Sequence, residues 1–161
     1  MKLQLFILQI ALSSCTTVGV NKLTKNLQAK RPSCQLDFYM EQSNVKTKFV
    51  NICTVQSNIG IFNSTSTPRA DALKNTRKLL CDCGADAVVF LGAGAGTFQR
   101  PVSFLGITYK SLPKEKPNNY ATGVKILTCR DAGGQWLEDQ CSVTDKQAEP
   151  QTPNEKRIQQ I

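Results

Sequence analysis

The sequence of 161 residues contains no histidine, and this absence excludes several classes of enzyme. Ser-His-Asp hydrolases, Cys-His proteases and histidine-dependent zinc proteases all need an imidazole as a base or as a metal ligand. Carboxylate pairs can also catalyse hydrolysis, but the spacing of the candidates does not separate a catalytic pair from solvated surface charges: Asp82, Asp86, Glu138 and Asp139. We therefore predict that the protein is not an enzyme and needs no cofactor.

Aromatic side chains are scarce as well, at 7% of the residues, and the net charge of +8 comes from basic residues that are scattered along the chain. A basic surface attracts anionic lipid, glycan or nucleic acid, but net charge predicts neither fold nor activity. Specific nucleic-acid binding uses basic residues clustered on one face, so we expect no nucleic acid among the partners. A hydrophobic content of 40% is enough for the core of one globular domain.

The N-terminus has the layout of a cleavable secretory signal. Lys2 precedes the apolar stretch LQLFILQIAL at residues 3–12, which is too short to span a membrane as a helix because a span needs about 20 residues. The residues LSSC at 12–15 resemble the bacterial lipobox, in which small residues allow cleavage before a cysteine that carries a diacylglyceryl group. We therefore expect residues 1–14 to be removed and Cys15 to be lipidated, with palmitate among its acyl chains.

The residue after Cys15 indicates which membrane holds the protein. In enteric-type sorting, an aspartate at this position retains a lipoprotein at the inner membrane, whereas this chain has Thr16. We therefore expect a lipid anchor in the outer membrane, with the domain in the periplasm or at the cell surface. The alternative is an ordinary signal followed by a coincidental cysteine.

The chain has seven cysteines, and this odd number supports the lipoprotein interpretation. One cysteine used for lipid leaves an even set, and export places that set in a compartment where disulfides form. Three bridges are therefore possible, but the sequence does not choose among the many pairings. The candidates are Cys34, Cys53, Cys81, Cys83, Cys129 and Cys141.

A metal site is the alternative interpretation of two of these thiols. Cys81 and Cys83 form a C-x-C motif, whereas structural zinc sites usually contain paired C-x-x-C elements or histidines. Residues two apart in a helix point roughly 200° from one another, so the two sulfurs cannot easily hold one ion. We favour disulfides and expect no metal, and a small-ligand or soft-metal site at free Cys81 and Cys83 remains the alternative.

The two ends of the chain differ in composition from its middle. Residues 16–33 are polar and basic with little periodicity, and together with lipidated Cys15 they are predicted to form a flexible tether of at most roughly 60 Å. Residues 143–161 contain two prolines, several glutamines and alternating charges, which is typical of a disordered tail. The folded domain is therefore expected at residues 34–142.

One helix is predicted at about residues 68–83. Thr67 followed by Pro68 is a typical helix start, small and apolar residues then recur at the spacing of one helical face, and Gly84 is a natural stop. The outer side of this helix carries a basic stripe, which we interpret as a solvated surface: Lys74, Arg77 and Lys78.

Short strands are predicted around this helix. The apolar run AVVFL at residues 87–91 is typical of a strand buried on both faces, and the glycine-rich residues 92–96 are interpreted as a turn rather than a phosphate-binding loop. The pattern indicates an α+β fold with a small mixed sheet, one main helix packed on it and disulfides that stabilise it. Further strands are predicted at residues 34–39, 48–55, 102–109 and 123–129.

Three segments in this order resemble a known family. They are the strand FVNICTV at residues 49–55, the helix end and strand KLLCDCGADAVVFL at 78–91, and the late strand GVKILTC at 123–129. Together they are similar to the small YbjQ-like fold, which includes the RcsF-like outer-membrane lipoproteins, and the resemblance is closest over residues 72–91.

This resemblance implies a compact domain that is held by disulfides, tethered by lipid and active as a sensor or adaptor of the envelope-stress type. Its partner is then another envelope protein. Only Cys129 has an evident counterpart in that family, and Cys81 and Cys83 lie where the family has none, so the resemblance implies no disulfide pairing. Some YbjQ-like proteins are labelled heavy-metal binding, which keeps the metal alternative open.

Overall fold

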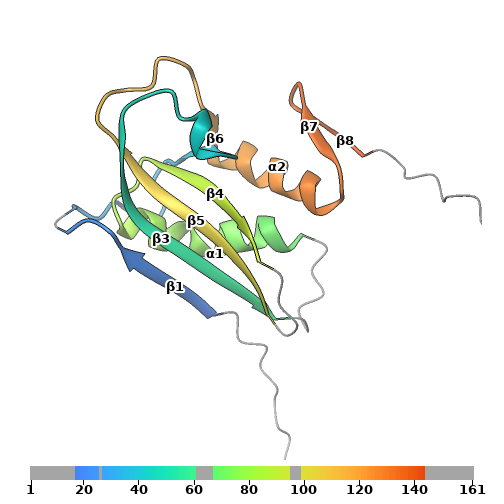
Figure 1. Cartoon of the computed structure of the whole chain (residues 1–161), viewed down its shortest axis with the longest axis horizontal. Coiled ribbons are helices and arrows are strands. Elements are labelled where there is room, and N and C mark those ends of the chain that lie inside the picture. The colour runs from blue at the N-terminus through green and yellow to red at the C-terminus, as the bar shows by residue number, and fades with distance from the viewer. Residues whose placement is uncertain (1–16, 26, 61–66, 95–98, 144–161) are drawn as a thin grey trace, which may run out of the picture.

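A computed structural model describes residues 17–25, 27–60, 67–94 and 99–143 (Figure 1). These residues form a six-stranded mixed sheet, two α-helices and a two-stranded hairpin. The predicted α+β fold class is therefore confirmed. The predicted signal at residues 1–14, Cys15 and the predicted tail beyond residue 143 lie outside the described residues.

The sheet has the strand order β1-β3-β5-β4-β2-β6. Its strands are β1 (Thr17–Lys22), β2 (Asp37–Tyr39), β3 (Phe49–Gly60), β4 (Ala87–Ala93), β5 (Gln99–Tyr109) and β6 (Asn118–Asn119). All neighbours pair antiparallel except β2 and β4, which are parallel. The long strands β3, β5 and β4 thus form the centre of the sheet, and short strands flank them.

Most of the predicted strands are confirmed with different lengths. β3 and β5 correspond to the predicted strands at residues 48–55 and 102–109, and both extend further. Of the predicted strand at 34–39, only the last three residues pair, as β2. Gly92 and Ala93, predicted as part of a turn, instead pair with β5 as the end of β4, and residues 95–98 lie outside the described residues.

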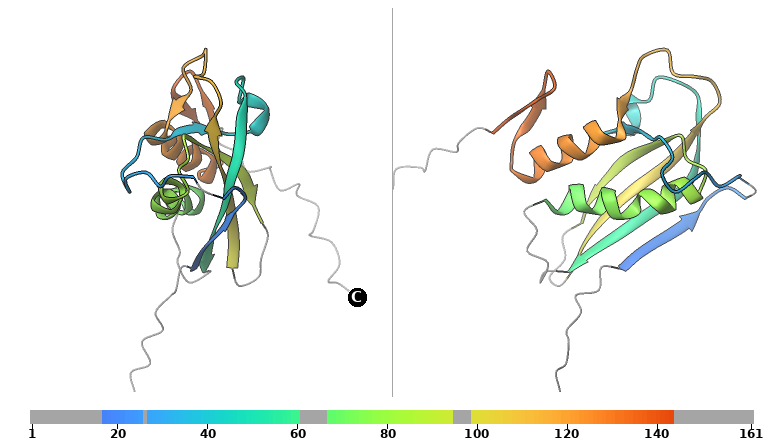
Figure 2. Two further views of the ribbon diagram at one scale, coloured as in Figure 1. Left: turned by 90° about the vertical axis from the view of Figure 1, so that its left-hand side faces the viewer. Right: turned by 180° about the vertical axis from the view of Figure 1, so that it is seen from behind.

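Both helices, α1 (Pro68–Asp82) and α2 (Tyr120–Asp131), cover the same face of the sheet (Figure 2). The bounds of α1 confirm the helix predicted at residues 68–83. Gly84 follows α1 with φ +86°, a left-handed conformation that glycine adopts without strain.

The segment at residues 123–129, predicted as a strand, lies in α2, so that prediction is wrong. Its β-branched residues and partial alternation favour a strand, but Asn119 caps a helix by accepting a hydrogen bond from the N–H of Thr122 at 2.9 Å. Gly123 then allows the helix to approach the sheet closely, since a Cβ there would lie 2.3 Å from the ring of Phe38. The helix is thus set by a cap and by a packing contact with a distant strand.

The predicted tether also differs from the structure. Residues 17–22 form β1, which pairs along its whole length with β3. The alternation in TVGVNK turns Val18 toward the core, where it packs against buried residues. Further along, the N–H of Lys30 donates to the carbonyl oxygen of Cys81 at 2.9 Å. The domain therefore begins with β1, and much of the segment predicted as tether belongs to it.

A hairpin of β7 (Gln135–Leu137) and β8 (Gln140–Ser142) follows α2 and stands apart from the main sheet (Figure 1). Glu138 and Asp139 form its turn, with φ values of +48° and +63°. Two positive φ values are typical of the type I′ turn that joins the strands of a tight hairpin.

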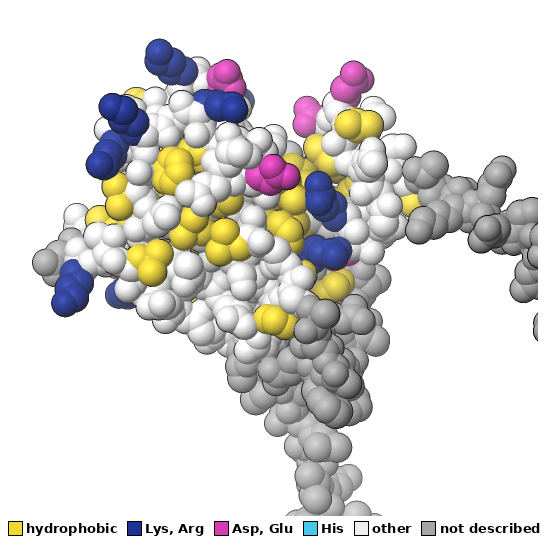
Figure 3. Space-filling view, viewed as in Figure 1, with side chains coloured by type: hydrophobic (Ala, Val, Ile, Leu, Met, Phe, Trp, Pro, Cys, Tyr) yellow, Lys and Arg dark blue, Asp and Glu magenta, His cyan; other side chains and the backbone are white. Residues whose placement is uncertain are grey.

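Buried residues form one cluster on each face of the sheet. The larger cluster lies between the sheet and the helices and contains Phe38, Leu73 and Leu127. Val88 belongs to it, whereas Ala87 and Val89 belong to the other, which confirms burial on both faces for the first three residues of AVVFL; Leu91, at the end of the run, is 49% exposed. Figure 3 views the face away from the helices, where hydrophobic side chains gather and basic ones lie around them.

Candidate functional site

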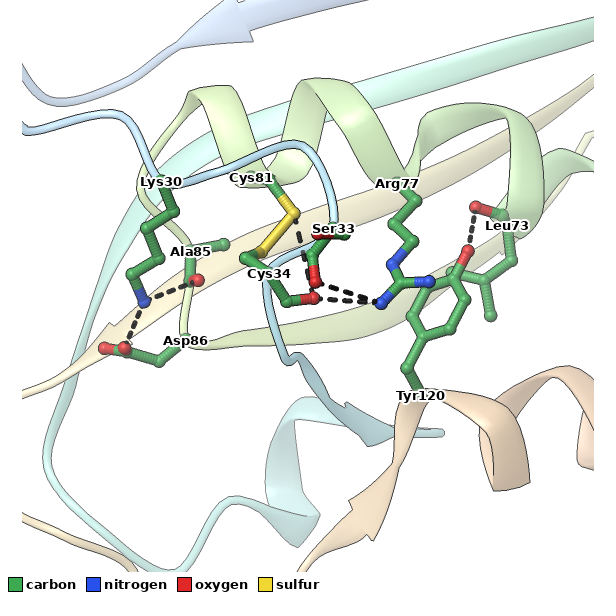
Figure 4. The surroundings of a disulfide bond; sticks show 9 residues. All are labelled: Lys30, Ser33, Cys34, Leu73, Arg77, Cys81, Ala85, Asp86 and Tyr120. Atoms are coloured by element: carbon green, nitrogen blue, oxygen red, sulfur yellow. Dashed lines mark hydrogen bonds and ion pairs between the residues drawn. A yellow bond between two sulfur atoms is a disulfide. The ribbon is translucent and has the colours of Figure 1, made fainter.

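Two disulfide bonds join the helices to neighbouring segments. Cys34, which precedes β2, is bonded to Cys81 in the last turn of α1 (Figure 4). Cys129 in α2 is bonded to Cys141 in β8, so the hairpin is fixed to that helix. Because bridges persist in oxidising compartments, they indicate an extracytoplasmic domain.

Cys53 in β3 and Cys83 at the end of α1 are free thiols, and both are buried. Burial raises the pKa of the Cys53 thiol above its ordinary range, and its hydrogen bond with Cys83 acts in the same direction. A buried, protonated thiol is a poor nucleophile and a poor metal ligand. Two of the three possible bridges are formed, and the remaining two cysteines are buried free thiols.

The alternative ligand or metal site at Cys81 and Cys83 is not formed in this structure. Cys81 is bonded to Cys34, and Cys83 is only 5% exposed. Over the described ranges, no group of three or more histidine, cysteine, aspartate or glutamate side chains is placed to hold a metal ion.

Arg77, predicted within a solvated basic stripe, instead contacts the segment around the first disulfide (Figure 4). Its Nη2 donates to the carbonyl oxygen of Cys34 at 3.1 Å, and its guanidinium carbon lies 4.8 Å from the ring centre of Tyr120. The Tyr120 hydroxyl donates to the carbonyl oxygen of Leu73 at 2.7 Å. Burial raises the pKa of Tyr120 to about 12, although the charge of Arg77 acts to lower it. The exposed members of the stripe are Lys74 and Lys78.

The four carboxylates considered for catalysis have separate structural settings. Asp82 pairs with Lys78 at 2.7 Å across one turn of α1. Glu138 and Asp139 lie exposed at the turn of the hairpin. Asp86 follows α1 and is surrounded by hydrogen-bond donors, so each of the four has a structural explanation.

Asp86 fixes the segment between β1 and β2 to the sheet. Its carboxylate accepts hydrogen bonds from Lys30 Nζ, from the Thr108 hydroxyl and from the backbone N–H of Tyr109, the last at 2.9 Å. Burial acts to raise the pKa of Asp86, but these hydrogen bonds and the charge of Lys30 together outweigh it, and the pKa lies below its ordinary value. Asp86 is therefore an ionised structural group at neutral pH.

A cleft of about 780 Å³ lies where α2, the hairpin and the end of β4 meet. Sequence reasoning missed it. Gly133 and Gly134 are typical of the end of a helix, but because residues 123–129 were predicted as a strand, no helix end was expected there. Its walls are mixed: polar side chains of the lining are Arg69, Asn118, Arg130 and Gln135, and apolar ones are Met40, Phe90, Ala93, Ile126, Trp136 and Leu137.

Two arginines line the cleft, and one of them pairs with a buried carboxylate. Arg69 Nη1 lies 2.9 Å from Asp131 Oδ1 and donates to the carbonyl oxygen of Arg130 at 3.4 Å, so the two arginines are neighbours. Asp131 is fully buried, and its Oδ2 accepts the N–H groups of Arg69 and Ala70 at 2.9 and 3.2 Å. It thereby caps α1, since Thr67 makes no side-chain cap bond. Arg130 is exposed, and none of the described carboxylates pairs with it.

The second disulfide and two glycines position the wall that carries Trp136. Gly133 has φ +77° and ends α2. At Gly134 a Cβ would lie 2.8 Å from Cys129 Sγ and 2.9 Å from Cys141 Sγ. The chain therefore turns tightly over the bridge, and Trp136 packs partly against the main core.

Comparison with known proteins finds one similar solved structure and no matching protein family. The fold is similar to that in a crystal structure of a Francisella virulence factor, FvfA, with a TM-score of 0.42 and 20% sequence identity over 60% of this chain and 99% of that chain. The sequence matches no protein-family model and no curated protein. No described helix has the length and hydropathy to cross a membrane. The RcsF-like resemblance stays a prediction.

Proposed function

We propose that this protein is a bacterial outer-membrane lipoprotein that acts by contact with an envelope protein partner, as a sensor or adaptor of the RcsF-like, envelope-stress type. The cleft is the observation that supports action by contact with a partner. Its lining offers arginine cations, the amide side chains of Asn118 and Gln135, apolar side chains and backbone, which are groups that bind, and the described lining residues include no acid, thiol or hydroxyl side chain. The lipobox-like LSSC supports the anchor, and the two disulfides support an extracytoplasmic domain.

The position of β1 sets how far the domain can lie from its anchor. β1 begins at Thr17, so one residue separates it from Cys15. Each extended residue spans at most about 3.6 Å, so a lipid on Cys15 holds the edge of the sheet at the membrane surface. This replaces the predicted tether of roughly 60 Å. The partner must then present its contact segment near the same membrane.

Site-specific photo-crosslinking in intact envelopes tests the proposal. One variant carries a photoreactive amino acid at Leu137, which lines the cleft and is 60% exposed. A matched control carries it at Leu112, which is 88% exposed and outside the cleft. We expect a crosslinked envelope protein from position 137 and none from position 112. Identical crosslinks from both positions contradict contact through the cleft.

The anchor is tested with Cys15→Ala in the same strain. This variant is expected to lose fatty-acid labelling, membrane association and the crosslink from position 137, and to remain folded. Fractionation is done at high salt, which screens the weak attraction of a basic protein to anionic lipid. Continued membrane association of Cys15→Ala under these conditions contradicts the lipoprotein assignment.

A further inference from the structure

The end of β4 has an edge without a neighbouring strand. β5 pairs with β4 along nearly its whole length, but β2 pairs only with Ala87–Val89. After Tyr39 the chain leaves the sheet and enters a 3-10 turn at Gln42–Asn44. Among the described strands, none pairs with the outer edge of β4 beyond Val89 (Figure 1). Beyond Val89 this part of β4 contains a β-bulge between Phe90 and Gly92, and after the bulge the backbone of Ala93 has no neighbouring strand on that edge among the described residues.

The cleft opens onto this edge. Phe90 and Ala93 come from the unpaired end of β4, and both line the cleft together with Met40, the residue that follows β2. Four residues of strand span roughly 13 Å. A cleft of about 780 Å³ is in the size range that encloses a ligand. An extended segment placed here continues the line of β2 along β4.

The charge of the cleft favours an acidic occupant. Arg69 and Arg130 both line it, with Arg69 Nη1 donating to the backbone carbonyl of Arg130, and a guanidinium group binds a carboxylate through paired, charge-assisted hydrogen bonds. Asp131 already pairs with Arg69 and accepts hydrogen bonds from N–H groups at the start of α1, whereas Arg130 has no acidic partner among the described residues. Figure 3 shows basic side chains next to hydrophobic ones where the body of the domain meets the hairpin.

The apolar wall favours hydrophobic side chains on the same occupant. Ile126 of α2 and Trp136 and Leu137 of β7 line the cleft, and Leu137 remains 60% exposed. Side chains of an extended segment alternate between two faces. One face of such a segment can therefore contact this wall while its backbone pairs with β4.

We infer that the cleft binds an extended, acidic peptide segment of a partner protein, which pairs with the open end of β4 as an added strand. The inference rests on the proposed contact function and names the chemistry of the partner. Strand addition provides affinity through main-chain hydrogen bonds and specificity through the side chains. The acidic residue is held by Arg130 and Arg69, and the apolar residues face the hairpin.

Selection from a phage-displayed library of random decapeptides tests the inference. The target is the full mature chain in its oxidised form with Cys15→Ser, and a parallel selection uses the same chain with Arg130→Glu. Enriched peptides are expected to combine an acidic residue with β-branched or aromatic ones. We expect them to bind the Arg130→Glu chain at least tenfold more weakly.

A matched control separates this effect from a change in net charge. Lys125→Glu reverses another exposed cation of α2, one that lies outside the lining of the cleft, and it is expected to leave peptide affinity unchanged. Both variants should melt with the wild-type midpoint. If Arg130→Glu unfolds the chain, Arg130→Gln takes its place in the comparison.

Backbone pairing is tested on the best peptide with two patterns of N-methylation, one on odd and one on even positions. Only every second N–H of an added strand points at its neighbour. One pattern should therefore abolish binding and the other should preserve it. In NMR spectra, the amide signal of Ala93 should shift when the peptide binds, because the N–H of Gly94 donates to Pro101 in β5 and Ala93 therefore faces the open edge.

Several outcomes overturn the inference. They are an absence of enriched peptides, equal enrichment on wild type and Arg130→Glu, or equal tolerance of both N-methylation patterns. Formation of a dimer of this chain through the cleft also overturns it, because the cleft then binds a second copy and not a partner segment. A crosslink from position 137 without selected peptides keeps the contact function and overturns strand addition. Selected peptides without that crosslink keep the peptide site and overturn the envelope function.

Discussion

Single residues determine how closely the two helices approach the sheet. Gly84 ends α1 in a left-handed conformation, and a Cβ there would lie 2.7 Å from the carbonyl oxygen of Gln28. Gly123 faces the ring of Phe38, which is completely buried. Neither position has room for a larger side chain, so both helices depend on a glycine for their placement.

Replacement of Gly123 tests this at α2. Alanine normally favours a helix over glycine by about 1 kcal/mol, but here its Cβ would overlap Phe38. We expect Gly123→Ala to lower the free energy of unfolding by about 1–3 kcal/mol in urea denaturation. Gly19→Ala is the control, because nothing lies within 4 Å of a Cβ at that position. An unchanged midpoint for Gly123→Ala contradicts the close contact.

Asp86 makes stability depend on pH. Its pKa lies lower in the folded chain than in the unfolded one, so its stabilising effect is present above the unfolded pKa of about 3.9 and is lost as pH falls through the folded value. Wild type should therefore exceed Asp86→Asn in free energy of unfolding at pH 7, and this difference should shrink in acid. Asp82→Asn, which removes an exposed helix pair, should show little of this change. If the difference in free energy of unfolding between wild type and Asp86→Asn does not change with pH, Asp86 is not an ionised stabilising group.

Whole elements were predictable where their pattern is local. The start, periodicity and stop of α1 and the apolar run of β4 are each contained in one continuous segment. α2 was not predictable in this way, because its apolar residues also fit a strand and the deciding contact is with Phe38 in β2. β1 is a six-residue strand whose role depends on pairing with β3. The cleft is assembled from the ends of several elements, so no single segment carried a signal for it.

The bridges between elements give a prediction for the oxidised protein. Its mass should be lower than that of the reduced protein by two hydrogens for each of the two bridges. Cys53 and Cys83 should react with an alkylating reagent only after unfolding, because both are buried. Loss of the Cys34–Cys81 bridge should cost about 4 kcal/mol and loss of the shorter-range Cys129–Cys141 bridge about 3 kcal/mol. A mass that indicates three bridges contradicts the free thiol pair.

At the scale of the whole molecule, the start of β1 and the cleft lie at the same end of the sheet. The pairing registers place Val18, Ser57, Val102 and Ala93 in one row across four strands. Strands lie about 4.8 Å apart, so the two ends of this row are separated by roughly 14 Å. Because β1 begins next to Cys15, a lipid on Cys15 keeps the open end of β4 near the membrane as well.

A spacer tests this arrangement. Insertion of a flexible Gly-Ser segment of 18 residues after Thr16 should lift the domain without altering its melting midpoint. The crosslink from Leu137 should weaken, because the local concentration of a membrane-bound partner segment falls with linker length. The same segment inserted after Val143 is the control and should leave the crosslink intact. Full crosslinking with the N-terminal spacer contradicts a partner segment held near the membrane.

The peripheral place of β1 also constrains the order of events during biogenesis of the proposed lipoprotein. The signal peptidase must reach the bond before Cys15, which lies two residues from the first residue of β1. β1 has a single neighbour in the sheet, so the strands and helices that follow it can assemble while the N-terminus is still held by the export machinery. In this proposed order, β1 pairs with β3 after the rest of the domain has formed, and the pairing brings the N-terminal end of the chain onto the edge of the sheet.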